Sequence, residues 1–263
     1  MNKILTIAGS DPSGGAGIQA DLKAFSALGT YGMSIISALT AQSTQGVDGV
    51  FPIPTDFIKA QYETLYQDIQ PDAVKMGALV NTDIINCVAD LLTAYPIAFV
   101  VLDTVMIAKG GHPLLVAEAV GAIRDRLLPL ADIITPNLPE AAALLGCEVA
   151  TTEAEMEAQG QALLALGPKA VLMKGGHLES EISPDLLVTK EGVERFVSPR
   201  IATKNTHGTG CTLSAAIAAL YPSHGLKNGV RLAKAYIDGA IENADKLAVG
   251  KGIGPTHHFY RWW

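Results

Sequence analysis

The fold is decided by the stretch Ile4-Leu5-Thr6-Ile7-Ala8-Gly9-Ser10-Asp11-Pro12-Ser13-Gly14-Gly15-Ala16-Gly17. Its apolar first part is typical of a buried strand, and the glycines behind it predict a tight turn. Ile18, Leu22 and Phe25 follow at helical spacing and share one face. A strand, a glycine-rich turn and an amphipathic helix in this order predict the first half of a βαβ unit.

The same alternation continues along the chain. A second apolar run covers residues 33–41, and we predict strands at 73–76, 98–103, 132–135 and 170–174. Helical spacing predicts helices near 58–69, 83–92, 114–127, 138–145 and 153–166, and the small apolar residues 213–220 favour another helix. Residues 186–189 and 193–197 predict an antiparallel hairpin at the edge of the sheet.

Regular alternation of this kind predicts an α/β fold in which a mostly parallel central sheet is covered by helices on both faces. No linker or low-complexity run interrupts it, so we expect residues 1–263 to form a single domain. In such folds ligands bind outside the carboxyl ends of the strands. The loops that follow the strands hold Asp11, Gln42, Asp103, Lys109-Gly110-Gly111-His112, Asn137, Glu140 and Lys174-Gly175-Gly176-His177.

The composition favours a small-molecule ligand. Of the 263 residues, 49% are hydrophobic and 17% are charged, and the net charge is −7. An acidic chain without clusters of Lys and Arg argues against nucleic acid or an anionic membrane as the main partner. The sequence has neither the pattern of a signal peptide nor an apolar run long enough for a membrane span, and we therefore expect a cytoplasmic protein.

The cysteines and the paired histidines do not predict a metal site. Cys87, Cys147 and Cys211 are odd in number and widely spaced, which indicates neither a disulfide framework nor a zinc site. His257-His258 has no cysteine or acidic residue at metal-ligand spacing. We interpret it as a polar pair.

The stretch Asn205-Thr206-His207-Gly208-Thr209-Gly210-Cys211 precedes the helix-favouring run and predicts an anion site. The first turn of a helix has backbone N–H groups without intrahelical partners, and glycines let a phosphate approach them. Cys211 falls in the positive field of this turn, so we expect its thiol to lose its proton easily. An ordinary helix start with a small buried cysteine is the alternative.

Two other polar features follow strands. Asn137 and Glu140 lie at i and i+3 on one face of a helix start, where they would either form a capping box or contribute to a Mg²⁺ site. Lys174 would either contact a phosphate or be a solvated edge residue. The sequence lacks both the P-loop motif and the third glycine of a dinucleotide fingerprint, which argues against a P-loop enzyme and against a Rossmann dehydrogenase.

Several of these segments together resemble one family. Residues 9–21, Thr40-Ala41-Gln42, Thr135-Pro136-Asn137-Leu138-Pro139-Glu140, Lys174-Gly175-Gly176-His177 and the stretch 205–211 are similar to those of bacterial hydroxymethylpyrimidine/phosphomethylpyrimidine kinases of thiamine biosynthesis. The likeness runs from residue 4 to Trp263 and is specific because the segments occur together. It implies a ribokinase-like three-layer sandwich and an ATP- and Mg²⁺-dependent kinase that phosphorylates hydroxymethylpyrimidine and then its monophosphate.

The resemblance also implies a role for individual residues. The amides of Gly208, Thr209 and Gly210 would form an anion hole. Cys211 would take the position of the aspartate base of sugar kinases, and Lys174 would contact the transferring phosphate. Glu140 would organise Mg²⁺, and the residues near ATP would be Asn137, Lys174, Thr209 and Lys251. The substrate pyrimidine would be contacted by Gly9, Asp21, Gln42, Ala78 and Val105. We expect a homodimer.

One position departs from the family pattern. The family commonly has methionine where this chain has Ala78, and Met76 would share a face with Ala78 if the segment were extended, so that it could partly fill the space. A pyridoxal kinase, or an enzyme with both activities, is therefore the nearest alternative. A non-catalytic sensor of a pyrimidine or nucleotide is disfavoured by the presence of Lys174, Glu140 and Cys211 together, because binding alone needs no base.

Overall fold

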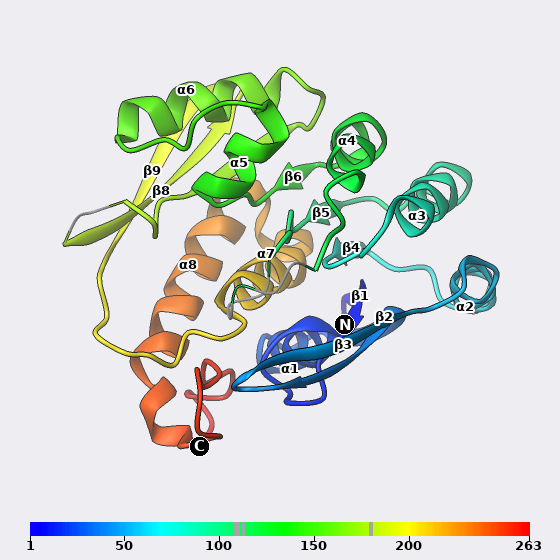
Figure 1. Cartoon of the computed structure of the whole chain (residues 1–263), viewed down its shortest axis with the longest axis horizontal. Coiled ribbons are helices and arrows are strands. Elements are labelled where there is room, and N and C mark those ends of the chain that lie inside the picture. Colours follow the sequence, from blue (N-terminus) through cyan, green and yellow to red (C-terminus); the bar gives the residue numbers. More distant parts are fainter. Residues whose placement is uncertain (108–110, 112–113, 179–180) are drawn as a thin grey trace.

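Within the residues that the computed structural model describes, 1–107, 111, 114–178 and 181–263, nine strands form one continuous sheet (Figure 1). The strands are β1 (Lys3–Ser10), β2 (Tyr31–Ser43), β3 (Gly46–Pro52), β4 (Ala73–Met76), β5 (Val100–Leu102), β6 (Ile133–Ile134), β7 (Ala170–Lys174), β8 (Ile182–Thr189) and β9 (Gly192–Pro199). Their order across the sheet is β3-β2-β1-β4-β5-β6-β7-β8-β9. The six central strands are parallel; β3 extends one side of the sheet as an antiparallel strand, and the antiparallel strands β8 and β9 extend the other.

Helices cover both faces of this sheet, as predicted. They are α1 (Gly17–Ala27), α2 (Thr55–Asp68), α3 (Thr82–Ala94), α4 (Ala119–Ala122), α5 (Leu138–Leu145), α6 (Glu153–Leu164), α7 (Thr209–His224) and α8 (Leu226–Glu242), with a π-helical turn η1 (Ile123–Leu127) and 3₁₀ turns η2 (Leu128–Leu130) and η3 (Ala244–Leu247). One apolar layer packs α2 to α6 on one face, and a second packs α1, α7 and α8 on the other. The predicted three-layer α/β sandwich is therefore confirmed.

Parallel strands inside such a sandwich are buried on both faces, which explains their continuous apolar runs. All six inner residues of β1 are buried, and so is every residue of β4. Because the central strands run in the same direction, their carboxyl ends meet at one edge of the sheet. The loops that follow β1, β4, β5, β6 and β7 converge there.

Two local predictions are wrong. The helix predicted at 114–127 begins only at Ala119, since the amides of Leu114 and Leu115 donate to Met106 O (2.9 and 3.1 Å) and hold this segment in a turn. The histidines interpreted as a polar pair are buried, with His257 3% and His258 4% exposed. No helix among the described residues combines the length and apolarity that crossing a bilayer requires.

Candidate active site

The start of α7 lies at the edge of the sheet where the parallel strands end. Gly208 caps this helix in the left-handed conformation (φ 78°), and a Cβ there would lie 1.7 Å from Gly15 O, so only glycine fits. The first hydrogen bond of the helical pattern runs from Thr212 N to Gly208 O (2.8 Å). In the turn before it, Thr209 N has a long hydrogen bond to Thr206 O (3.3 Å), and Gly210 and Cys211 take the first-turn positions whose amides bind anions.

Lys174 and two carboxylates lie beside this turn. Lys174 Nζ is 3.3 Å from Asp103 Oδ1 and 3.9 Å from Glu140 Oε2. A Cβ added at Gly210 would lie 3.4 Å from the same Nζ. Burial lowers the pKa of Lys174, but the two carboxylates outweigh burial and hold this pKa above its usual value. Lys174 is therefore a fixed cation next to the anion-binding turn and not a solvated edge residue.

Asp103 is a functional candidate to which sequence reasoning assigned no role. Its carboxylate is buried and accepts hydrogen bonds from Thr135 Oγ1 (3.1 Å) and Ser214 Oγ (3.2 Å). Burial raises its pKa, yet Lys174 and Lys75 hold this pKa below the usual value. Its place directly after a buried strand was the available signal, but its partners lie far away in the sequence.

Asn137 and Glu140 form the capping box that the sequence offered as one of two alternatives. Asn137 N donates to Glu140 Oε2, and Glu140 N donates to Asn137 Oδ1, both at 2.9 Å. The same Glu140 Oε2 accepts from Thr104 Oγ1 at 3.1 Å and faces Lys174. The box therefore does not exclude a second role, because it holds the carboxylate at the edge where ligands are expected.

The Glu140 carboxylate fits a role beside a divalent cation. Burial raises its pKa, Lys174 offsets only part of that rise, and Asp103 adds to it. Additional positive charge would relieve this cost. The described residues contain no group of three or more His, Cys, Asp or Glu side chains that could hold a metal ion. Mg²⁺ commonly needs only one or two protein carboxylates, with water and phosphate oxygens completing its shell.

Cys211 does not have the acidic thiol that the sequence predicts. Burial raises the pKa of Cys211 to about 11, Lys75 offsets part of this rise, and Asp103 and Asp21 add to it. The hydrogen bond from Gly17 N lowers this pKa but does not reverse the rise. Without bound ligands, Cys211 therefore keeps its proton at neutral pH.

A buried ion pair lies beneath the thiol. Lys75 Nζ contacts both Asp21 carboxylate oxygens at 2.9 Å, Thr6 Oγ1 donates to Asp21 Oδ2 at 2.6 Å, and Lys75 and Asp21 have no exposed surface. Burial lowers the pKa of Lys75, whereas Asp21 and Cys211 raise it above the usual value. Sequence reasoning missed Lys75, although a lysine inside an otherwise apolar strand signals a buried partner. Contact between Asp21 and a substrate stays a prediction.

The other residues predicted around the substrate lie at the ends of β1, β2, β4 and β5. Gly9 lies at an irregularity in the pairing of β1 with β2. Ala78 and Val105 are half-buried, and Ala78 O accepts a hydrogen bond from Ser37 Oγ (2.8 Å). Met76 ends β4 and is fully buried in the core, and its filling of the space beside Ala78 stays a prediction.

Gln42 is connected to the anion-binding turn by a histidine. His207 Nε2 lies 2.8 Å from Asp11 Oδ2 and 3.4 Å from the side-chain amide of Gln42. Five donors surround Asp11: Ser13 N, Ser13 Oγ, Gly15 N, Ala16 N and the His207 ring. These contacts lower the pKa of Asp11 to about 2 although burial opposes the shift.

Lys251 is exposed and lies in a segment that packs on the turn between β2 and β3. In that segment Ile253 N donates to Thr44 O (2.9 Å), and Gly254 N donates to Asn205 Oδ1 (3.0 Å). The predicted loop Lys109-Gly110-Gly111-His112 falls mostly outside the described residues, which include only its Gly111.

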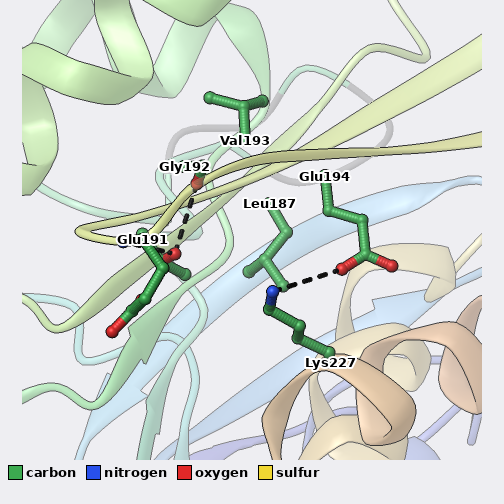
Figure 2. Close-up of a pocket in the computed structure, with 7 residues that line it drawn as sticks. Leu187, Glu191, Gly192, Val193, Glu194 and Lys227 are labelled. Carbon is green, nitrogen blue, oxygen red and sulfur yellow. Dashed lines mark hydrogen bonds and ion pairs between the residues drawn. The ribbon is translucent and has the colours of Figure 1, made fainter.

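A shallow pocket at the turn between β8 and β9 belongs to another part of the molecule. It is lined by Leu187, Thr189, Glu191, Gly192, Val193, Glu194 and Lys227, and an ion pair joins Lys227 Nζ to Glu194 Oε2 (4.0 Å; Figure 2). Thr189 pairs with Ala170, which begins β7, whereas Lys174 ends that strand. The pocket therefore lies at the opposite edge of the sheet from the candidate active site.

Comparison with known sequences identifies one family over nearly the whole chain. A profile described as phosphomethylpyrimidine kinase matches residues 11–257. A hydroxymethylpyrimidine/phosphomethylpyrimidine kinase of Escherichia coli (strain K12) is 60% identical over 260 residues, which cover 98% of each chain. The Rhizobium meliloti (strain 1021) protein of the same name is 49% identical over 265 residues, covering 98% of this chain and 97% of the relative.

Solved structures agree. The ADP complex of Bacillus subtilis pyridoxal kinase has a TM-score of 0.91 at 40% identity and covers 100% of both chains. A phosphomethylpyrimidine kinase from Clostridium difficile 630 has a TM-score of 0.82 at 45% identity, covering 92% of this chain and 100% of the other. The fold is thus ribokinase-like. With a profile match and full-length relatives at this identity, the chain belongs to the phosphomethylpyrimidine kinase family.

Proposed function

We propose that this protein transfers the γ-phosphoryl group of ATP to the hydroxymethyl group of hydroxymethylpyrimidine, and then phosphorylates the monophosphate to the diphosphate, for thiamine biosynthesis. The observation that carries the proposal is the convergence of the anion-binding turn at Gly208–Gly210, the Lys174 cation and the Cys211 thiol at one edge of the sheet. Phosphoryl transfer depends on such positioning and on stabilisation of negative charge.

Each group has a role in this reaction. The turn amides of Gly208, Thr209 and Gly210 bind the transferring phosphoryl group, and Lys174 balances its charge. Because its thiol is protonated at neutral pH, Cys211 acts as a proton relay: Sγ takes the proton of the substrate hydroxyl while its own S–H proton passes to a phosphoryl oxygen. The transition state is loose, so this proton moves late.

Asn137, Lys174, Thr209 and Lys251 would bind ATP, and Gly9, Asp21, Gln42, Ala78 and Val105 would surround the pyrimidine. Glu140 would hold Mg²⁺, which when bound supplies charge neutralisation on the phosphates. The support for Glu140 is its raised pKa beside Lys174 and Asp103. A cytoplasmic location would supply the ATP that the reaction consumes.

A coupled assay of ATP consumption tests the reaction. We expect turnover with hydroxymethylpyrimidine and with its monophosphate, and loss of turnover when Mg²⁺ is chelated. Product identification by mass spectrometry separates the two phosphorylations. The proposal is wrong if neither pyrimidine stimulates ATP consumption by the folded protein.

Pyridoxal phosphorylation is a second candidate activity, favoured by the small side chain of Ala78 and by the similarity to pyridoxal kinases. If Ala78 widens the ring site, Ala78→Met lowers kcat/KM for pyridoxal more than for hydroxymethylpyrimidine. Equal effects on both substrates would count against this role of Ala78.

We also propose a homodimer and a single domain spanning residues 1–263. The β3 edge of the sheet supports the dimer, because the cross-strand pair Leu39 and Phe51 is 44% and 63% exposed and Phe57 nearby is 61% exposed. The single continuous sheet supports one domain. Phe51→Glu should convert the dimer to a monomer in light scattering; a wild-type protein that is monomeric at micromolar concentration contradicts the dimer.

A further inference from the structure

The chain directly after Lys174 is held by a buried acidic side chain of the neighbouring strand. Gly175 packs so closely on β8 that a Cβ there would lie 2.0 Å from Pro184 O. Its amide donates a hydrogen bond to Asp185 Oδ1 at 3.0 Å. Because Asp185 is buried, its negative charge needs a partner inside the protein.

That partner is a lysine of α8. Lys234 Nζ lies 2.6 Å from Asp185 Oδ2, and the two side chains are 12% and 4% exposed. Asp238, one turn further along α8, accepts a hydrogen bond from Ser198 Oγ of β9. Burial raises the pKa of Asp238, Ser198 and Lys234 lower it, and Asp185 adds to the rise. Lys234 is thus a cation between two half-buried or buried carboxylates and is paired with one of them.

The same Asp185 stands directly opposite Lys174. In the antiparallel pairing of β7 with β8, Lys174 is the partner of Asp185, just as Leu172 is the partner of Leu187. Both leucines belong to the apolar layer that contains α7 and α8. Lys174 and Asp185 lie two residues further along their strands and therefore project from that same face. The Cβ atoms of such a pair are about 4.5–5.5 Å apart, well within the reach of a lysine side chain.

Lys174 nevertheless pairs with other carboxylates. Its Nζ is 3.3 Å from Asp103 Oδ1 and 3.9 Å from Glu140 Oε2, beside the anion-binding turn. Without Lys234, Asp185 would be a buried carboxylate that faces Lys174 across the strands and has lost its cation. Opposite charges attract strongly in such surroundings, and Lys174 would be drawn towards Asp185 and away from the turn.

We propose that Lys234 is a positioning residue: by occupying Asp185, it keeps the Lys174 ammonium group at the anion-binding turn. This inference rests on the proposed function, in which Lys174 balances the charge of the transferring phosphoryl group. A pair that only fastened α8 to the sheet would be broken equally by the loss of either partner. Here the two losses differ, because only the loss of Lys234 leaves a charge that competes for Lys174.

The test compares kcat of folded Lys234→Met, Asp185→Asn and the double variant at saturating hydroxymethylpyrimidine and ATP. Lys234→Met should lower kcat about tenfold or more, because Lys174 leaves the reacting phosphate. Asp185→Asn should keep kcat close to that of the wild type, since asparagine still offers an acceptor to Gly175 N and Asp238 remains near Lys234. The double variant should regain most of the activity lost in Lys234→Met.

Two further variants serve as controls. Lys234→Arg keeps the cation beside Asp185 and should retain kcat. Lys227→Met is the matched control, because Lys227 also joins α8 to the sheet, with Nζ 4.0 Å from Glu194 Oε2, but at the turn between β8 and β9. It should leave kcat unchanged. Equal losses in Lys234→Met and Asp185→Asn, or a double variant no more active than Lys234→Met, would overturn the inference.

A measurement without turnover separates this inference from the proposed function. In a crystal structure of Lys234→Met, Lys174 Nζ should lie within about 4 Å of an Asp185 oxygen. Lys174 that stays beside Asp103 in this variant would overturn the inference, whatever the kinetics show. If the wild type phosphorylates neither pyrimidine, the proposed function fails, and the position of Lys174 in the variant still decides whether Lys234 controls it.

Discussion

Cys211 and Lys174 differ in how their surroundings hold their protons, and this difference leads to a first prediction at the scale of single residues. Lys174 stays charged between two carboxylates, whereas the Cys211 thiol stays protonated with a pKa of about 11. If the thiol relays the substrate proton, Cys211→Ala lowers kcat about 10²- to 10⁴-fold and leaves the Kd for ATP unchanged. Steady-state kinetics with a nucleotide titration measure both, and near-normal turnover would refute the relay.

The Lys75–Asp21 pair makes a second prediction, on stability. Because Asp21 has no exposed surface, Lys75→Met leaves a buried carboxylate without its cation and should lower the free energy of unfolding by about 3–5 kcal/mol. Adding Asp21→Asn should recover most of this loss. Lys169→Met is the matched control: Lys169 contacts Asp132 at 2.6 Å but is 79% exposed, so its loss costs less than about 1 kcal/mol. Urea unfolding measures all three, and equal losses at Lys75 and Lys169 would contradict the argument.

At the scale of elements, α7 depends on the glycine that precedes it. Gly208→Ala places a methyl group 1.7 Å from Gly15 O and strains a backbone with φ 78°, so the turn has to move. We expect kcat to fall about a hundredfold, because the turn amides lose their alignment. Gly225→Ala is the control, since φ there is 69° but no atom lies within 4 Å of a Cβ. Comparable losses of kcat in the two variants would show that backbone strain, and not the contact with Gly15, is responsible.

The elements also show what the sequence can predict. Residues 73–76, 138–145 and 170–174 are predicted with the bounds they have in β4, α5 and β7, because apolar runs or a cap mark both ends. β3 escapes prediction from sequence because its residues are half-buried or exposed and include two glycines. α8 escapes it too, because Gly239 interrupts the helical pattern. A Cβ at Gly239 would lie 2.4 Å from the Tyr260 ring, and this contact exists only in the folded chain.

In the candidate active site too, only features that are local in sequence can be predicted. The anion-binding turn and the Asn137–Glu140 pair are predictable because each is local in sequence. The partners that set the pKa of Cys211 are not, since Lys75 and Asp103 lie more than a hundred positions away along the chain. A helix start predicts an acidic thiol, and only the packed structure shows that burial and carboxylates outweigh it.

At the scale of the whole molecule, the buried His258 predicts how stability depends on pH. Burial and the charges of Lys23 and His257 lower the pKa of His258 to about 3, against about 6.5 in an unfolded chain. Between these values only the unfolded state binds the proton, so His258 lowers the free energy of unfolding by about 1.4 kcal/mol for each pH unit below 6.5. His258→Gln keeps a donor for Thr212 Oγ1 and cannot titrate.

We therefore expect the wild type to lose about 2 kcal/mol more than His258→Gln between pH 6.5 and pH 5, measured by urea unfolding at both values. Asp11, with a pKa of about 2, acts only at lower pH, where its loss has the same sign. Parallel pH profiles for the two proteins would mean that His258 is protonated in the folded state.

The bonds between His207 and residues 254–256 have a consequence for synthesis of the protein. His207 N donates to Gly254 O and Thr256 N donates to His207 O, so the loop before Gly208 obtains these partners from a segment made after α8. A nascent chain that has emerged from the ribosome only as far as α8 lacks both of these partners, so the backbone groups of His207 cannot yet be held as they are in the complete fold. The turn that begins α7 therefore reaches its final geometry only after the last residues of the chain have been made and packed.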